Sequence, residues 1–425
     1  MGYVLPRQST VFTMLCAVST ALCAACGAGE AERTAVAANP ETSGVRPGIE
    51  VLLTDSLHLV EGRRVGLITN HTGMDRQRRS TIDLLADHPS VELVALFAPE
   101  HGLRGEANEG AMIESGVDEG TGVPIHSLYG DTRKPTPEML EGVEVLLFDI
   151  QDVGARYYTY PSTMALGMEA GGEMGIPFVV LDRPNPIRGD VVQGNVLDPA
   201  YSTFVGRYPV PMRHGMTHGE LARLIAGAFG VSVDLTVVPV DGLTRSMTFD
   251  DTALPWIAPS TNMPSLESAL AYPGTCLFEG TPISIGRGTD RAFQWVGAPW
   301  LDADALAAAM NAHGFEGVRF EPVRFTPTNP SDGKFGGEEL PGVRIVAESS
   351  DYDAPRVGIA LVVETFRMTP AERWEWRVTH FDRLSGTDAV RQGIEAGLGV
   401  DDITASWDGG IAAFESLRAP YLIYR

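Results

Sequence analysis

Residues 148–160, FDIQDVGARYYTY, place two carboxylates, an amide, an arginine and three tyrosines directly behind an apolar strand. The strand expected at 144–148 has four apolar residues out of five, as a strand buried on both faces requires. The carboxyl edge of a parallel sheet is where ligands bind, and all these polar groups hydrogen-bond hydroxyls. The segment therefore suits sugar chemistry. Its candidates are Asp149, Gln151, Asp152, Arg156 and Tyr160.

Three other apolar strands, expected at 64–70, 92–98 and 177–182, also end in polar residues. In a doubly wound sheet the loops behind parallel strands lie side by side along one edge. We therefore expect all four loops to share one binding cleft; a solvated rim is the alternative. The additional candidates are Asn70, Glu100, His101 and Arg183.

Glu100 is the sharpest catalytic candidate, because Pro99 stiffens its position behind the strand at 92–98. A carboxyl group at an apolar strand end suits a general acid, since desolvation favours the protonated form. The alternative is a helix-cap or salt-bridge glutamate. Asp149 and Asp152 compete for the second carboxylate role, and we expect one of them only to orient Arg156. At least one of the three tyrosines is expected in the core, with Tyr160 facing the sugar.

Missing motifs narrow the chemistry. The chain has no G-x-G-x-x-G behind its first strand, no phosphate-binding P-loop and no G-x-S-x-G elbow. Carboxylate acid–base catalysis is therefore the preferred enzymatic interpretation, and no cofactor is expected. His214 and His218 have a spacing that could hold zinc. Gly215 and Gly219 disfavour a helix there, so we expect no metal and one substrate-facing histidine, His214, at a helix entry.

The elements that must position these residues alternate as in an α/β fold. Helices are expected at 79–88, 162–174 (capped by Ser162) and 220–228, with a further strand at 235–240. This alternation predicts a doubly wound parallel sheet in a domain spanning 46–240. A second domain, 241–425, is expected to contain helices at 302–313 and 387–396 and a strand at 357–366.

Composition and the amino terminus limit the partners and the location. A net charge of −23 argues against nucleic-acid binding. Residues 1–26 have the features of a signal peptide, and the small residues before Cys26 resemble a lipobox, although ordinary signal-peptidase cleavage is the alternative. We expect an exported, cell-envelope or periplasmic protein that is lipid-anchored at Cys26, with 27–45 as a flexible tether and no other membrane contact. The oligomeric state is left open.

Several longer segments carry a family resemblance: NHTG at 70–73, FAPEHG at 97–102, 149–160, DRPNP at 182–186, RHG at 213–215, and the segments 259–264, 272–275 and 279–289. Together they resemble the DUF1343 family of NamZ-type exo-β-N-acetylmuramidases, which release N-acetylmuramic acid from the non-reducing ends of peptidoglycan fragments. The resemblance implies a Rossmann-like domain, a smaller α/β domain and a cleft between them. It also implies that Glu100 is catalytic.

A muramyl saccharide would impose its own requirements on the cleft. Its lactyl carboxylate needs a cation, for which Arg156 and Arg287 are the first choices, with Arg183 and Arg213 also available. Its N-acetyl group suits Asn262 or Gln151. The Gly-rich turn at 279–289, which begins with Glu279, is expected to close the cleft, and Trp295 could be a sugar platform or a buried ring. The rival functions are a non-catalytic sugar-binding protein and a hydrolase of another anionic glycan.

Overall fold

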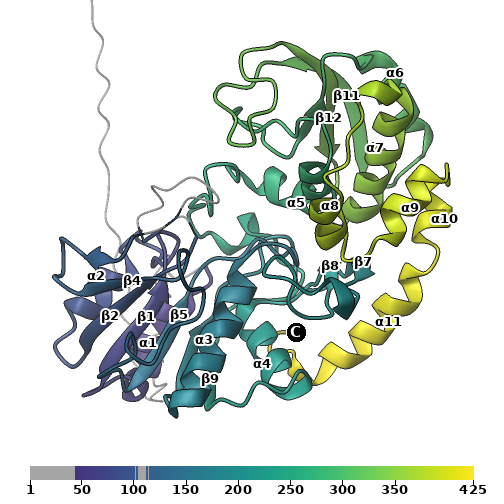
Figure 1. The fold of residues 1–425 in the computed structure, drawn as a ribbon. Helices are drawn as coiled ribbons and strands as arrows, with labels where there is room; N and C mark the ends of the chain where they lie inside the picture. The colour runs from purple at the N-terminus through teal and green to yellow at the C-terminus, as the bar shows by residue number, and fades with distance from the viewer. Residues whose placement is uncertain (1–43, 101, 104–111, 113) are drawn as a thin grey trace, which may run out of the picture. The chain divides into compact units, whose positions relative to one another are not determined.

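The computed structural model describes residues 44–100, 102–103, 112 and 114–425. Its larger sheet has seven strands in the order β3-β4-β2-β1-β5-β6-β9, and every neighbouring pair except β3 and β4 is parallel (Figure 1). The chain starts near the middle with β1, builds one side, and returns to build the other. This confirms the doubly wound sheet. The strands are β1 (Arg64–Thr69), β2 (Glu92–Ala98), β3 (Gly116–Val117), β4 (Pro124–Ser127), β5 (Val145–Asp149), β6 (Phe178–Leu181) and β9 (Leu235–Val238).

Helices cover both faces of this sheet because its central strands are apolar on both sides. Leu67 and Leu147 pack with α1 (Gly48–Asp55) and α2 (Thr81–Ala86). Their neighbours Ile68 and Phe148 point the other way and pack with α3 (Tyr160–Met174) and α4 (His218–Ala228). The reversal between adjacent residues follows from the two-residue period of a strand.

The expected helix starts need correction. Helix α3 begins at Tyr160 behind Thr159, so Ser162 lies in its first turn and does not cap it. Helix α4 begins at His218, where Thr217 and Glu220 form a reciprocal capping box. Both helices therefore start closer to the sheet edge than the sequence suggested, which brings their first residues to the region of the expected cleft.

The smaller second domain has a three-stranded antiparallel sheet in the order β10-β12-β11. The expected strand at 357–366 is wrong: these residues belong to helix α7, which opens with Asp353 as its cap and Pro355 in its first turn. The strands are β10 (Trp295–Gly297), β11 (Val318–Phe325) and β12 (Leu340–Ala347). A separate two-stranded sheet, earlier in the chain, pairs β7 (Gln193–Val196) with β8 (Pro211–Arg213). The helices are α5 (Leu266–Thr275), α6 (Ala303–Ala312), α7 (Ala354–Met368), α8 (Val378–Ser385), α9 (Ala389–Glu395), α10 (Val400–Thr404) and α11 (Trp407–Arg418).

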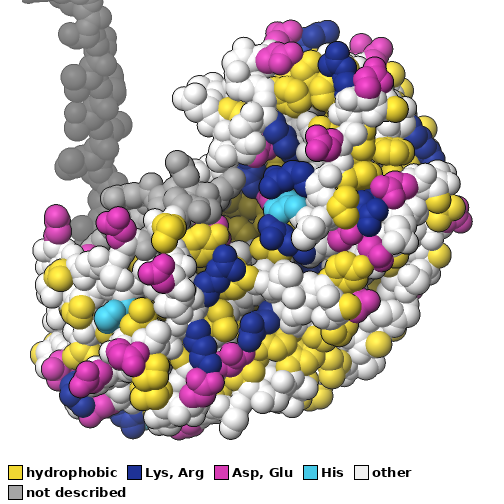
Figure 2. Space-filling model, viewed as in Figure 1, with side chains coloured by type: hydrophobic (Ala, Val, Ile, Leu, Met, Phe, Trp, Pro, Cys, Tyr) yellow, Lys and Arg dark blue, Asp and Glu magenta, His cyan; other side chains and the backbone are white. Residues whose placement is uncertain are grey.

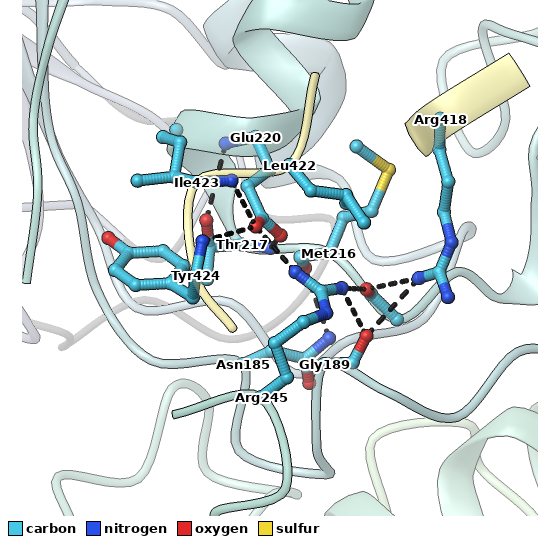
Figure 3. A network of polar contacts seen from close by, with 12 residues as sticks. Asn185, Gly189, Met216, Thr217, Glu220, Arg245, Arg418, Leu422, Ile423 and Tyr424 are labelled. Atoms are coloured by element: carbon cyan, nitrogen blue, oxygen red, sulfur yellow. Dashed lines mark hydrogen bonds and ion pairs between the residues drawn. The ribbon is translucent and has the colours of Figure 1, made fainter. Parts of the chain in front are cut away.

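The carboxyl terminus returns to the first domain and packs on α4 (Figure 3). The Glu220 carboxylate accepts the backbone N–H of Ile423 at 2.9 Å and forms an ion pair with Arg245 at 2.5 Å. The Tyr424 hydroxyl donates to the buried Asp182 carboxylate at 2.6 Å. The last residues of the chain therefore fasten the second domain to the first.

No helix in the described part of the chain is long and apolar enough to cross a membrane. The predictions for residues 1–26, for the tether and for Cys26 lie outside the residues that the structure describes.

Candidate active site

A cavity of about 480 Å³ lies at the carboxyl edge of the large sheet and is lined by residues of both domains. Such a volume is ordinary for a small-molecule site. The first domain contributes the end of β2, the start of α3 and a loop near Phe204, and the second contributes the turn at 279–287 and helix α8. Figure 2 shows basic side chains and a histidine gathered around a hollow on this face. Of the four loops that were expected to share one cleft, those behind β2 and β5 line this cavity, whereas those behind β1 and β6 do not.

Glu100 lines this cavity from the first domain. It follows β2 and Pro99 in a turn that is closed by a bond from the Gly102 N–H to the Pro99 carbonyl at 3.0 Å. The Thr159 hydroxyl, at the start of α3, donates to Glu100 Oε2 at 2.8 Å. The carboxyl group is thus fixed between the end of a strand and the beginning of a helix. His101 lies outside the described residues.

The aromatic wall of the cavity consists of Tyr157, Tyr158 and Tyr160 together with Tyr272 and Phe293. The expectation that at least one of the three clustered tyrosines lies in the core is confirmed, because all three are buried in the core and border the cavity from there. Their rings pack edge to face, with centroids 5.0 Å apart for Tyr158 and Tyr160 and 4.7 Å apart for Tyr272 and Phe293, so each presents part of its surface. Asn70 does not line the cavity; its amide donates to the Tyr160 hydroxyl at 2.8 Å and so orients that ring.

Glu279 lines the cavity from the second domain, inside a network of positive and hydrogen-bonding groups. Arg287 lies 2.5 Å from its Oε1, and His380 Nε2 lies 3.2 Å from its Oε2. Burial alone would raise the pKa of Glu279, but Arg287 and the His380 hydrogen bond outweigh it and hold that pKa at about 2. Glu279 is therefore a carboxylate at any physiological pH. Asn262, predicted to hold the N-acetyl group, lies behind this network and donates to Ser331 Oγ at 3.1 Å.

Asp149 and Arg183 are not in the cavity, contrary to the prediction. Both are buried, and Arg183 Nε and Nη2 grip the Asp149 carboxylate at 2.5 and 3.0 Å. The Thr81 hydroxyl adds a third bond to the same carboxylate at 2.5 Å. The Asp149 carboxylate therefore joins the ends of β5 and β6 to α2, and it does not face the cavity.

Asp152 and His214 are also buried away from the cavity, so the substrate-facing roles expected for them need correction. The Met216 N–H donates to His214 Nδ1, which leaves the proton on Nε2, 3.4 Å from Asp152 Oδ2. His218 Nε2 lies 4.0 Å from Asp152 Oδ1, and burial lowers the pKa of His218 despite this carboxylate. Gln151 donates to the Pro184 carbonyl at 2.7 Å and likewise faces the protein. No group of ligating side chains in the described ranges is arranged to hold a metal ion.

Arg156 and Arg213, offered as partners for an anionic ligand, are structural as well. Arg156 is only 3% exposed, and its guanidinium donates to four backbone carbonyls, those of Asn195, Val210, Leu384 and Ser385. Burial lowers its pKa to about 10. Arg213 is fully buried and donates to Gln193 Oε1 at 3.0 Å and to the Ser350 carbonyl at 2.8 Å. Of the predicted arginines, Arg287 alone lines the cavity.

Sequence reasoning missed a set of cavity residues outside the family segments: Tyr129, Arg133, Phe204, Arg377, His380 and Arg383. The last three are spaced three residues apart, a signal that one helix face carries them, although nothing in the sequence indicated where that face would point. Arg133 stacks over Phe204, with its guanidinium carbon 4.2 Å from the ring centroid. Trp295 packs against Phe325 and is not a cavity residue.

Two solved structures share this fold. Both are DUF1343 family proteins from Bacteroides fragilis NCTC 9343. The first is 36% identical, with a TM-score of 0.83, and covers 90% of this chain and 100% of its own. The second is 34% identical, with a TM-score of 0.73, and covers 90% of this chain and 99% of its own.

Sequence comparison gives the same relationship over nearly the whole chain. The peptidoglycan beta-N-acetylmuramidase NamZ of Bacillus subtilis (strain 168) is 45% identical over 400 residues, which is 92% of this chain and 96% of the relative. The family model for the N-terminal part of the exo-beta-N-acetylmuramidase NamZ matches residues 65–267, and the model for the C-terminal part matches residues 270–424. The chain therefore belongs to the NamZ family.

Proposed function

We propose that this protein is an exo-acting β-N-acetylmuramidase, a glycosidase that releases N-acetylmuramic acid from the non-reducing ends of peptidoglycan fragments. The observation that carries this proposal is that Glu100 and Glu279, two carboxyl groups from different domains, line one cavity with an aromatic wall. The extent of the similarity to a peptidoglycan muramidase supports the choice of substrate.

Glycoside hydrolysis commonly uses two carboxyl groups, one of which protonates the leaving oxygen while the other acts as an anion. Glu100 suits the proton donor, since it lines the cavity just behind β2 and the Thr159 hydroxyl fixes its Oε2 at 2.8 Å. Glu279 suits the anionic role, because Arg287 and His380 keep it ionised. It can stabilise the positive charge that develops on the sugar ring or activate the attacking group. Glu279 thus replaces Asp149 and Asp152 as our candidate for the second carboxylate.

The aromatic wall supports sugar binding next to these carboxylates. Tyrosine rings offer apolar surface to the C–H groups of a pyranose. Tyr160 is held for this purpose by Asn70 and by the Pro259 carbonyl. A sugar in this position would lie at the start of α3, next to Glu100.

The experiment uses aryl β-glycosides of N-acetylmuramic acid and of N-acetylglucosamine with the purified mature protein. We expect release of the aryl group from the first, and a loss of about 10³-fold or more in kcat when Glu100→Gln removes the proton donor. Glu173→Gln, on the exposed end of α3, is the matched control and should behave as wild type. Release from neither glycoside would favour the non-catalytic or alternative-substrate readings, and an unchanged rate in the Glu100 variant would remove that residue from the mechanism.

The location also belongs to the proposal. We propose that the protein is exported and lipid-anchored at Cys26, with residues 27–45 as the tether to the catalytic domain at 46–240 and the closing domain at 241–425. The support is the apolar stretch and the small residues before Cys26. Replacing Cys26 by Ser should move the protein from the membrane fraction to the soluble fraction. Equal membrane retention of both forms would contradict the anchor.

A further inference from the structure

Four arginines line the cavity, and they differ in whether their charge is balanced. Arg287 is paired with Glu279 at 2.5 Å. In the described part of the chain, Arg133, Arg377 and Arg383 have no carboxylate within ion-pair distance. The cavity lining therefore has an excess of positive charge, with four arginines against the carboxyl groups of Glu100, Glu279 and Asp332, and this excess favours an anionic group.

Two of these arginines come from one face of helix α8, on either side of His380. Arg377 is the residue before the first helical turn, and Arg383 lies in the last turn, so the three side chains repeat every three residues. Residues at this spacing lie along one side of a helix. The face formed by Arg377, His380 and Arg383 is called the α8 basic face below.

Contacts with Glu279 hold the α8 basic face in place. Arg383 Nη2 lies 2.5 Å from His380 Nδ1. Because the guanidinium can only donate, His380 Nδ1 must accept, and its proton lies on Nε2, which faces Glu279. Arg383 Nε is buried and has no hydrogen-bond partner. A buried N–H donor without a partner is costly unless a ligand supplies the acceptor.

Arg377 lies at an unusual position for a basic residue, and this position also favours a bound anion. It occupies the N-cap position of α8, where Ser, Thr, Asp or Asn is preferred, and α8 has no side-chain cap. A positive charge at this end of a helix is unfavourable, because the helix dipole is itself positive there. Arg377 is nevertheless fixed to the η5 segment (Cys276–Gly280), since its backbone N–H bonds to the Gly280 carbonyl and its Nη1 bonds to the Glu279 carbonyl. A bound carboxylate next to Arg377 would offset both the charge of its guanidinium and the positive end of the helix dipole.

We propose that the α8 basic face binds the lactyl carboxylate of muramic acid through Arg383 and Arg377 and thereby determines specificity. The inference rests on the proposed function, because it assumes a muramyl substrate. Arg287 is the weaker candidate, since Glu279 already neutralises it. The lactyl ether is what distinguishes N-acetylmuramic acid from N-acetylglucosamine, so a site that reads its charge selects between the two sugars. The side chains that choose the substrate are thus joined through His380 to Glu279.

The test compares the aryl β-glycoside of N-acetylmuramic acid with the same glycoside whose lactyl carboxylate is a neutral amide. Wild type should prefer the acid. In Arg383→Gln and Arg377→Gln, kcat/KM for the acid should fall about 10- to 100-fold, mainly through KM, as expected for losing a hydrogen bond to a charged group. The ratio of kcat/KM for the acid to kcat/KM for the amide should fall by the same factor, and circular dichroism checks that the variants are folded. Arg373→Gln, outside the cavity and stacked on Trp300, is the matched control.

The failures of the two proposals are distinguishable. If wild type cleaves neither glycoside, the proposed function is wrong. If wild type cleaves and prefers the acid, but both α8 variants keep that preference, the carboxylate site lies elsewhere and the present inference is overturned. Equal losses on acid and amide would overturn it too, since they would mean that the arginines only support Glu279 through His380. Loss of the preference in Arg133→Gln alone would move the site to the opposite wall.

Discussion

Two residues, Glu100 and Glu279, show how surroundings divide chemical roles between identical side chains. The Thr159 hydroxyl donates to Glu100, whereas Glu279 is enclosed by Arg287 and His380. A carboxylate next to a guanidinium stays charged, so Glu279 suits the anionic role. Pairs of this kind are how one active site performs both acid and base chemistry. The residue type alone would not have separated them.

The low pKa of Glu279 predicts how the protein responds to acid. Its folded-state pKa of about 2 lies below the ordinary value of 4.5, so its stabilising contribution is present above pH 4.5 and is lost as the pH falls towards 2. A shift of this size corresponds to roughly 3 kcal/mol. We expect Glu279→Gln to be less stable than wild type at pH 6 and the difference to shrink between pH 4.5 and 3. Thermal unfolding of both proteins across this range measures it.

Comparing wild type with the Glu279 variant also cancels the contribution of Asp182 to stability, whose pH dependence has the opposite sign. Burial raises the pKa of Asp182 to about 6, so its contribution is present below its ordinary value of 3.8 and is lost as the pH rises through 6. That change occurs equally in wild type and in the Glu279 variant. A stability difference between the two that does not depend on pH would contradict the proposed ion pair of Glu279 with Arg287.

At the scale of elements, the sequence predicted what local patterns encode. Strand β2 has the predicted bounds, and the loops behind β2 and β5, two of the four expected, line the cavity. Helix α7 was mistaken for a strand because ten of its fifteen residues are buried, so its apolar run has no polar face and hence no helical period. Asp353 and Pro355 were the helix-start signal that could have corrected this.

The site was predictable only where its residues follow strands or Gly-rich turns. Glu100, Tyr160, Glu279 and Arg287 were found in this way. Polar residues in the same loops, such as Asp149, were placed in the cavity wrongly, because a sequence does not show which side of a loop faces a ligand. The α8 basic face was missed for the opposite reason: it reaches the cavity only through the packing of α8 against η5, a contact between distant segments.

Arg156 gives a prediction at this scale, because its one guanidinium joins three separate elements. It donates to carbonyls near β7, β8 and the end of α8. Arg156→Gln should leave several buried carbonyls without donors and destabilise the protein by about 3–5 kcal/mol, as breaking a buried charged network does. Chemical unfolding measures the loss. The surface substitution Arg373→Gln should change the unfolding free energy by less than about 0.5 kcal/mol. Similar stability of the two variants would mean that Arg156 does not hold these elements together.

At the scale of the whole molecule, a single apolar core crosses the division between the two predicted domains. Ile68 of the large sheet, Val357 of α7 and Phe414 of α11 belong to one buried cluster. Residues 43–425 also form one compact unit. A cavity lined by both domains needs such rigidity, because its two carboxylates come from opposite sides of the boundary. The boundary predicted at residue 240 therefore does not divide this apolar core.

The carboxyl terminus should show this dependence most directly. Deleting residues 419–425 removes the Tyr424 hydroxyl from Asp182 and two backbone donors from Glu220, leaving two buried carboxylates short of partners. We expect a loss of roughly 3–5 kcal/mol in unfolding free energy, still in one transition, because the damage lies in the shared core. Tyr424→Phe keeps the ring and loses only the hydroxyl, so it should cost about 1–3 kcal/mol.

Urea unfolding followed by tryptophan fluorescence and by circular dichroism tests this. Six tryptophans, all after residue 250, report mainly on the second domain, whereas circular dichroism reports on both. Coincident curves for the deletion protein would support a single cooperative unit. Separate curves, or a wild-type midpoint, would show that the first domain is stable without its carboxyl-terminal clamp.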